Sequence, residues 1–165
     1  GIAHSINEGL VRSAGLMPNM TEAERGWSLV ADVGIAVGQH TNVCLGKPCA
    51  DPALIPSMLN ENGEFHSSRT FRDHFKRGEE LIDFDEACIE IRAQHDRFVE
   101  IVGREPDYFE AHAVMSKNLN RAISAVAQEL GLKEQKASFD PAAVVHCGDT
   151  DLRMVMRSME PGYEP

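Results

Sequence analysis

The sequence lacks long apolar runs, a secretory leader and clustered basic residues. None of its 165 residues belongs to an apolar stretch near the roughly 20 that a membrane-spanning helix needs. The first residues carry neither the basic nor the apolar segment of a signal peptide. The formal net charge is −10 and no basic run exceeds two residues, whereas phosphate binding needs clustered Lys and Arg. These absences favour a globular protein without a membrane or nucleic-acid partner.

Paired cysteine motifs are also absent. The four cysteines are Cys44, Cys49, Cys88 and Cys147, and none forms a CxxC pair. This spacing supports neither a zinc knuckle nor a thioredoxin-type redox motif. Without a secretion signal, reduced thiols and a cytoplasmic location are expected.

Ordinary globular composition is what the sequence does have. Apolar residues make up 42% of the chain and charged residues 25%, and no internal repeat is visible. This length and composition suit one compact domain over residues 1–165.

Expected helices alternate with short strands along the chain. The clearest helix covers about residues 85–102, where apolar side chains follow one another at spacings of four and three. Three other helices are expected: one over 3–13, one that begins after a capping box formed by Thr21 and Glu24, and one that begins at about residue 118. Strands are expected over 35–40, 107–112 and 133–137, and a β-hairpin is expected to pair 142–145 with 151–156. This alternation predicts βα units around a mainly parallel sheet or barrel.

Two histidines stand at the ends of expected strands, His40 and His112. Sites in α/β proteins gather at these strand ends, because the following loops converge there. His40 shares its strand face with Gly38, which leaves space beside the imidazole, and His112 shares its face with Glu110. An imidazole beside a carboxylate is a common arrangement in metal sites.

The residues alone also allow a structural interpretation. A histidine at a strand end is often simply hydrogen-bonded, and two histidines are fewer than the three protein ligands of a typical catalytic zinc. His95 lies on the apolar stripe of its helix and is expected to pack, while His66 and His74 look like surface residues. Cys44 could reach a soft metal, although thiolate ligands normally come in sets.

Short motifs occur in a fixed order along the chain. They are Asn7-Glu8-Gly9, Leu16-Met17-Pro18-Asn19, Gly38-Gln39-His40-Thr41, Gly46-Lys47-Pro48, Gln94-His95-Asp96-Arg97-Phe98, Gly103-Arg104-Glu105-Pro106, Phe109-Glu110-Ala111-His112, Ser138-Phe139-Asp140 and Pro161-Gly162-Tyr163. In this order they resemble the YdjC-like family of carbohydrate deacetylases. The ordered series is specific, although no single motif is.

The resemblance implies a distorted (β/α) barrel of the sugar-deacetylase type, in which one Asp and two His bind a divalent metal ion, Mg or Zn. The two histidines carry over to His40 and His112. The metal-binding Asp and a neighbouring Asp, which is the expected base, are expected before Gly1, so the catalytic residues stay unassigned here. Glu110 is expected to orient His112 without binding the metal itself, and Asn19 is expected to contact substrate. The chain is expected to be truncated at both ends.

The predicted function is metal-dependent removal of an N-acetyl group from an amino sugar or a chito-oligosaccharide. The loop over 41–63 is expected to cover or frame this small-molecule substrate, and homo-oligomer formation is left open. The chain departs from the family at Ala113-Val114-Met115, where further histidines are usual, and at Glu110, where Asp is usual. These departures keep two alternatives open: a non-catalytic metal- or sugar-binding module (or inactive family member), and a structural fragment with hydrogen-bonded histidines.

Overall fold

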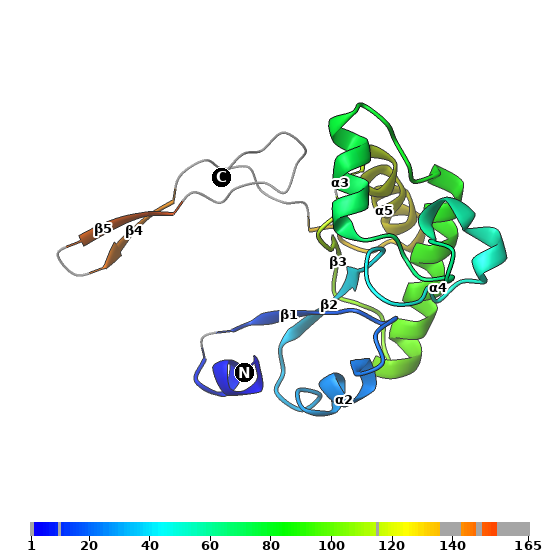
Figure 1. Ribbon diagram of the computed structural model, residues 1–165. Coiled ribbons are helices and arrows are strands. Elements are labelled where there is room, and N and C mark those ends of the chain that lie inside the picture. The colour runs from blue at the N-terminus through cyan, green and yellow to red at the C-terminus, as the bar shows by residue number, and fades with distance from the viewer. Residues whose placement is uncertain (1, 10, 115, 136–142, 148–149, 155–165) are drawn as a thin grey trace.

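The fold is built on a parallel sheet with strand order β1-β2-β3 (Figure 1). The computed structural model describes residues 2–9, 11–114, 116–135, 143–147 and 150–154. The three strands are β1 (Ser13–Leu16), β2 (Ala36–Thr41) and β3 (Phe109–Ala111). Parallel strands need crossover connections, and helices occupy both of those here.

Helices fill the connections and follow the last parallel strand. In chain order the helical elements are α1 (Ile2–Asn7), α2 (Ala23–Ser28), the 3-10 turns η1 (Pro52–Leu54) and η2 (Pro56–Met58), α3 (Ser68–Lys76), α4 (Phe84–Val102) and α5 (Lys117–Leu130). A separate antiparallel pair, β4 (Ala143–Cys147) and β5 (Thr150–Met154), forms a two-stranded sheet. The described part of the chain is thus a mixed α/β structure, in which the parallel sheet does not form a closed barrel.

Helix α4 is the central helix of the core. Phe98, Ile91 and Ala87 have no exposed surface, and the helix packs against α5. The Asp83 carboxylate accepts the N–H groups of residues 85 and 86, and Gly103 ends the helix at φ 78°. The predicted helix over 85–102 is therefore confirmed to within one residue at its start.

The N-terminal helix is shorter than predicted. It ends at Asn7, and Ser13, the last residue of the expected helix, is the first residue of strand β1. Gly9 adopts φ 74°, a conformation that breaks a helix. The capping box was also wrong, because α2 begins at Ala23 after Glu22, which makes no side-chain capping bond.

The segment between β2 and α4 is better ordered than its sequence indicated. Ile55 and Met58 have no exposed surface and belong to the same core cluster as Ile91. The polar stretch that follows holds α3, an additional helix whose Ser67 hydroxyl accepts the N–H of Thr70. The loop over 41–63 is therefore a packed part of the domain.

The C-terminal expectations are met in part. The predicted hairpin is present as β4 and β5, while its turn residues 148 and 149 lie outside the described residues. The strand expected over 133–137 appears as one parallel bridge between Glu134 and Phe109, and residues 136–137 are not described. None of the helices in the described ranges is long and apolar enough to cross a membrane.

Candidate active site

Strands β2 and β3 bring His40 and His112 into contact. The two imidazoles meet edge to face with centroids 4.8 Å apart, and His40 Nε2 lies 2.8 Å from His112 Nδ1. The N–H of His112 donates to the Thr41 carbonyl at 2.9 Å, which continues the β2–β3 pairing past the end of β3. The two histidines that the sequence predicts as site residues are 72 positions apart in the chain, and the fold brings them into contact.

Glu110 contacts His40 and not His112, with which the sequence analysis paired it. Its Oε1 lies 2.7 Å from His40 Nδ1. The parallel register explains this, because Glu110 lies directly opposite His40 and the side chains of paired residues share one face. His112 lies one residue beyond β3 and reaches His40 through its own ring.

The hydrogen bonds define the tautomer of each ring. An ionised carboxylate only accepts, so Glu110 fixes the proton of a neutral His40 on Nδ1. His40 Nε2 then carries a lone pair, and His112 donates to it from Nδ1. Burial and the neighbouring His40 ring lower the pKa of His112, while Glu110 acts in the opposite direction. His112 is thus held as a neutral imidazole at neutral pH.

Two glycines make room on this face of the sheet. A Cβ at Gly15 would lie 2.3 Å from Glu110 Oε1 and 2.9 Å from His40 Cβ. A Cβ at Gly38 would lie 2.3 Å from the Tyr108 ring, so the space expected beside His40 at Gly38 is filled by Tyr108. The space that the His40–Glu110 pair uses is instead provided by Gly15, which the sequence analysis placed outside any strand.

A backbone outlier follows His112 directly. Ala113 has φ 48°, and it is the one non-glycine residue with positive φ in the described part of the chain. This conformation costs an L-residue roughly 1–2 kcal/mol and is found repeatedly at functional sites. It turns the chain sharply after His112 and before the buried Val114.

Asn19 lies in the loop after β1, and its side chain is already bonded within the chain. Its Nδ2 donates to the carbonyls of Leu45 and Lys47, both at 3.0 Å, and its Oδ1 accepts from Asn42 Nδ2 at 3.0 Å. Both amide hydrogens are thereby used. This geometry joins the loop after β1 to the loop after β2, and the expected substrate contact of Asn19 stays a prediction.

A buried polar network behind the sheet was not visible in the sequence. Gln39, Asn42, Glu90 and Gln94 have no exposed surface. Gln39 alternates with His40 on β2 and donates to the Ile91 carbonyl of α4, so α4 covers the face opposite His40. The bonds that join α4 to β2 and to the loop after it span 40 to 52 residues, a separation at which no local pattern links the partners.

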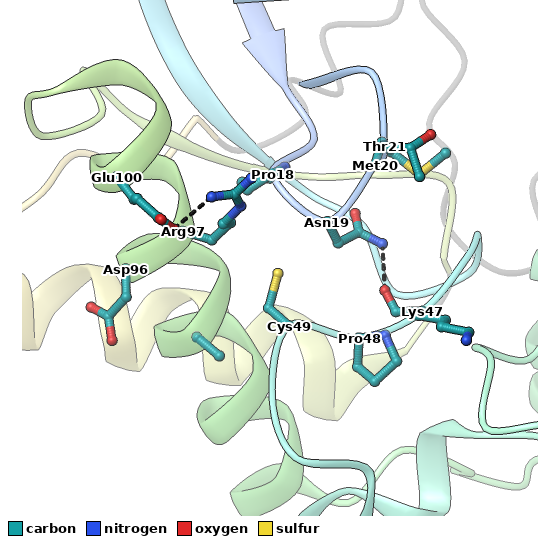
Figure 2. Close-up of a pocket in the computed structure, with 11 residues that line it drawn as sticks. Pro18, Asn19, Met20, Thr21, Lys47, Pro48, Cys49, Asp96, Arg97 and Glu100 are labelled. Atoms are coloured by element: carbon teal, nitrogen blue, oxygen red, sulfur yellow. Dashed lines mark hydrogen bonds and ion pairs between the residues drawn. The ribbon is translucent and has the colours of Figure 1, made fainter. Parts of the chain in front are cut away.

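An open pocket of about 580 Å³ lies beside the network (Figure 2). Residues 18–21, residues 47–49 and one side of α4 line it, and Figure 2 shows Arg97 paired with Glu100 there. Burial and the charge of Glu90 raise the pKa of the Cys49 thiol to about 12. Neither His40 nor His112 lines this pocket, so it is distinct from the histidine pair.

The other histidines and the candidate thiol lie elsewhere. His95 is buried and pairs with Glu105 at 2.5 Å, as expected of a packing residue. His66 packs edge to face on Phe71, and His74 pairs with Glu79 at 2.8 Å on α3. Cys44 is buried in the apolar core, where its pKa is raised by burial.

A divalent ion is compatible with the histidine pair as two of its ligands. With metal–nitrogen distances of about 2.1 Å, two ligands at right angles stand about 3.0 Å apart, close to the 2.8 Å between His40 Nε2 and His112 Nδ1. Both atoms could bind one ion only when the His112 proton lies on Nε2 instead of Nδ1, because a nitrogen that carries a proton has no free lone pair. Glu110 on the far nitrogen of His40 supplies the outer carboxylate that metal-bound histidines usually have. Within the described residues no group of three His, Cys, Asp or Glu side chains gathers around one point.

These features define an α/β protein with a carboxylate-supported histidine pair at the carboxyl edge of a parallel sheet. A family model described as "YdjC-like protein" matches residues 1–162. The chain belongs to this family.

Several relatives in the family carry deacetylase names. The chain is 36% identical over 115 residues to a carbohydrate deacetylase of Geobacillus stearothermophilus, which covers 68% of this chain and 42% of the relative. It is 29% identical over 135 residues to a chitooligosaccharide deacetylase of Serratia marcescens, with 80% and 51% covered. The chain thus spans about half the length of the relatives it matches.

A solved structure shares the same fold. It is a protein of Enterococcus faecalis V583 for which cellobiose-phosphate cleavage has been suggested. The TM-score is 0.70 at 26% sequence identity, and the match covers 84% of this chain and 52% of the other.

Proposed function

We propose that this chain is part of an enzyme that hydrolyses the N-acetyl group of an amino sugar or a chito-oligosaccharide. The observation that carries the proposal is the His40–His112 contact, supported by Glu110, in a family whose named relatives deacetylate carbohydrates. The proposal includes completion of the parallel sheet into a distorted (β/α) barrel. A cytoplasmic location and a homo-oligomer stay sequence-based predictions.

In this reaction water adds to the acetyl carbonyl carbon, the C–N bond breaks, and the amine leaves with a proton. His40 and His112 would hold a divalent cation, Mg or Zn, as two of its ligands. When bound, the cation supplies Lewis acidity for the amide carbonyl and lowers the pKa of water.

Residues around the histidines prepare them for this role. Glu110 keeps the His40 proton on Nδ1 and leaves the Nε2 lone pair facing His112. Burial favours neutral His112, which is the form that can bind a cation. The hydrogen bonds from Asn19 to the carbonyls of Leu45 and Lys47 hold this part of the backbone next to the strand ends, where the sugar is proposed to bind.

The test is acetate release from N-acetylglucosamine oligomers by the protein expressed from its complete reading frame, loaded with Mg²⁺ or Zn²⁺. Wild-type protein should release acetate, and His112→Ala should lower kcat/KM by about 10³-fold or more, since several kcal/mol of stabilisation are removed. His74→Ala is the matched control, because His74 also pairs with a glutamate but lies on α3 and is not part of the His40–His112 pair. It should retain full activity.

A second candidate is a non-catalytic metal- or sugar-binding protein. The absence of a third ligand among the described residues favours it. Stoichiometric metal binding that His112→Ala abolishes, without acetate release from any N-acetylated sugar tested, would support this candidate against the enzyme. Absence of both metal binding and turnover would leave the histidines as a hydrogen-bonded structural pair.

A further inference from the structure

A side chain of helix α4 closes the strand edge next to the histidine pair. Gln94 Oε1 accepts the backbone N–H of Asn42 at 3.1 Å, and Gln94 Nε2 donates to the Asn42 carbonyl at 2.6 Å. Gln94 therefore satisfies both backbone groups of one residue, as a neighbouring strand would. Both residues are completely buried, so water does not replace these bonds.

Asn42 lies directly after the last residue of β2, next to the backbone bond that joins β2 to His112. It follows Thr41, the last residue of β2, whose carbonyl accepts the N–H of His112. The pairing of β1 with β2 stops at Gln39, so β1 does not reach this part of the edge. The end of β2 is thus held on one side by the His112 backbone and on the other by Gln94.

Glu90 fixes the orientation of the Gln94 amide. Gln94 Nε2 donates to Glu90 Oε1 at 2.8 Å, and the same carboxylate accepts the N–H groups of Cys49 at 3.0 Å and Ala50 at 2.9 Å. A flipped amide would place the Gln94 oxygen against both the Glu90 carboxylate and the Asn42 carbonyl. The donor and acceptor of Gln94 are therefore locked in the arrangement that matches the Asn42 backbone.

We propose that Gln94 is a positioning residue for the His40–His112 pair. It touches neither imidazole, and it acts by fixing the end of β2, from which His40 projects and to which His112 is bonded. Its loss frees the Asn42 peptide, lets the strand end shift, and moves His40 Nε2 out of register with His112 Nδ1. The effect on turnover rests on the proposed function, whereas the effect on the two rings does not.

The experiment replaces Gln94 by methionine, which matches its length and removes both hydrogen bonds. Long-range ¹H–¹⁵N correlation spectra of the histidine rings, recorded without added metal, report the protonation and hydrogen bonding of each nitrogen. Gln94→Met should shift the His40 Nε2 and His112 Nδ1 resonances and leave those of His66 and His74 unchanged. In the metal-loaded protein, kcat should fall roughly 10- to 100-fold, with KM changed less than about threefold.

Glu86→Gln is the matched control. Glu86 also lies on α4 and accepts a loop N–H, that of Ser57 at 2.8 Å, but it has no bond to Asn42. It should weaken the attachment of the loop and leave the His40 and His112 resonances unchanged. If Gln94→Met does not fold, Glu90→Gln removes the carboxylate that orients the Gln94 amide and keeps Gln94 itself. It should give smaller shifts of the same two resonances, and unchanged resonances in it would count against the proposal.

Unchanged His40 and His112 resonances in a folded Gln94 variant would overturn the proposal, whatever the activity. The same holds if Glu86→Gln produces equal shifts, because general loosening of the loop would then be the cause. A wild-type protein without acetate release, combined with selective shifts in Gln94→Met, would overturn the proposed function and retain the positioning role.

Discussion

Two histidine–glutamate pairs lie on opposite faces of the parallel sheet and have different surroundings. His40 pairs with Glu110 at 2.7 Å on the strand face, and His95 pairs with Glu105 at 2.5 Å on the helix face. The other nitrogen of His40 faces the ring of His112, whereas the other nitrogen of His95 lies 3.5 Å from an Asp96 carboxylate oxygen. The His95 ring also packs edge to face on Phe109.

This difference shows that a histidine–carboxylate pair does not by itself define a site. Both nitrogens of His95 face carboxylates, and its ring fills space in the core, so its environment is structurally complete. His40 has one nitrogen fixed by Glu110 and one directed at a second neutral imidazole. The proposed cation site depends on this second imidazole, which the His95 pair lacks.

The largest expected contrast comes from removing each histidine. His40→Ala should lower deacetylation kcat/KM by about 10³-fold or more and change the free energy of unfolding by less than about 1 kcal/mol, because His40 is partly exposed. His95→Ala should cost roughly 2 kcal/mol of stability through the cavity and lost contacts, without changing activity per folded molecule. Urea unfolding measures the stability of the two variants, and acetate-release assays measure their activity. Equal losses of activity in His40→Ala and His95→Ala would contradict the assignment of different roles to the two pairs.

Removing the carboxylate charge should give a smaller difference in activity between the His40–Glu110 pair and the His95–Glu105 pair. Glu110→Gln keeps the shape but loses the ionised acceptor of His40, and activity or metal affinity should fall roughly 10- to 100-fold. Glu105→Gln should leave both unchanged, because His95 does not face the site. Isothermal titration with Zn²⁺ provides the measurement, and a Glu110→Gln protein that binds as tightly as wild type would contradict the assigned role of Glu110.

A methyl group added at Gly15 would fill the space that the His40–Glu110 pair occupies, and its effect on stability is expected to be mainly steric. Gly15→Ala places a methyl group where the Glu110 carboxylate lies, and should cost about 1–3 kcal/mol of stability while displacing Glu110 from His40. Gly26→Ala is the control, since no atom lies within 4 Å of its added Cβ and alanine favours its helix. Thermal unfolding of the Gly15→Ala and Gly26→Ala variants measures this cost. A Gly15→Ala protein as stable as wild type would show that Glu110 moves aside freely.

The smallest expected effect concerns the support of β2 and its dependence on pH. Burial acts to raise the pKa of Asp107, but the Val37 N–H at 2.7 Å and the Arg104 guanidinium outweigh it, and the pKa lies below its ordinary value. The unfolded chain therefore binds this proton more readily. The resulting stability is present above about pH 4 and is lost as the pH falls through the folded-state pKa.

Asp107→Asn should reduce the stability lost on acidification by less than about 1 kcal/mol, because the carboxylate is partly exposed and screened. Free energies of unfolding measured from pH 2 to pH 7 (about the span of carboxylate titration) test this. A loss of stability on acidification identical to that of the wild type would assign the acid sensitivity to other carboxylates.

The sequence predicts the features that depend on local spacing. The four-three spacing of apolar residues locates α4, and the strand-end positions of His40 and His112 predict that they lie at one edge of the sheet. The family resemblance, carried by the ordered motifs, is likewise confirmed.

Features that depend on pairing between distant segments could not be predicted. Glu110 bonds His40 because of the β2–β3 register, which no local pattern specifies. β1 was not predicted, because its sequence, Ser-Ala-Gly-Leu, contains no β-branched residue and forms a strand only against β2. The Gln94–Asn42 clamp joins residues 52 positions apart, so its partners become visible only in the folded chain.

The long crossover between β2 and β3 has a consequence for how the protein folds. Closing a loop of this length costs chain entropy before any contact across it can compensate, and pairing between distant parallel strands is intrinsically slow. The central helix and the turns of this crossover form from local contacts, whereas His40 and His112 meet only when β3 docks beside β2. Acquisition of the histidine contact should therefore coincide with the slowest step of folding, and the final increase in secondary structure and the appearance of the site should share one rate constant.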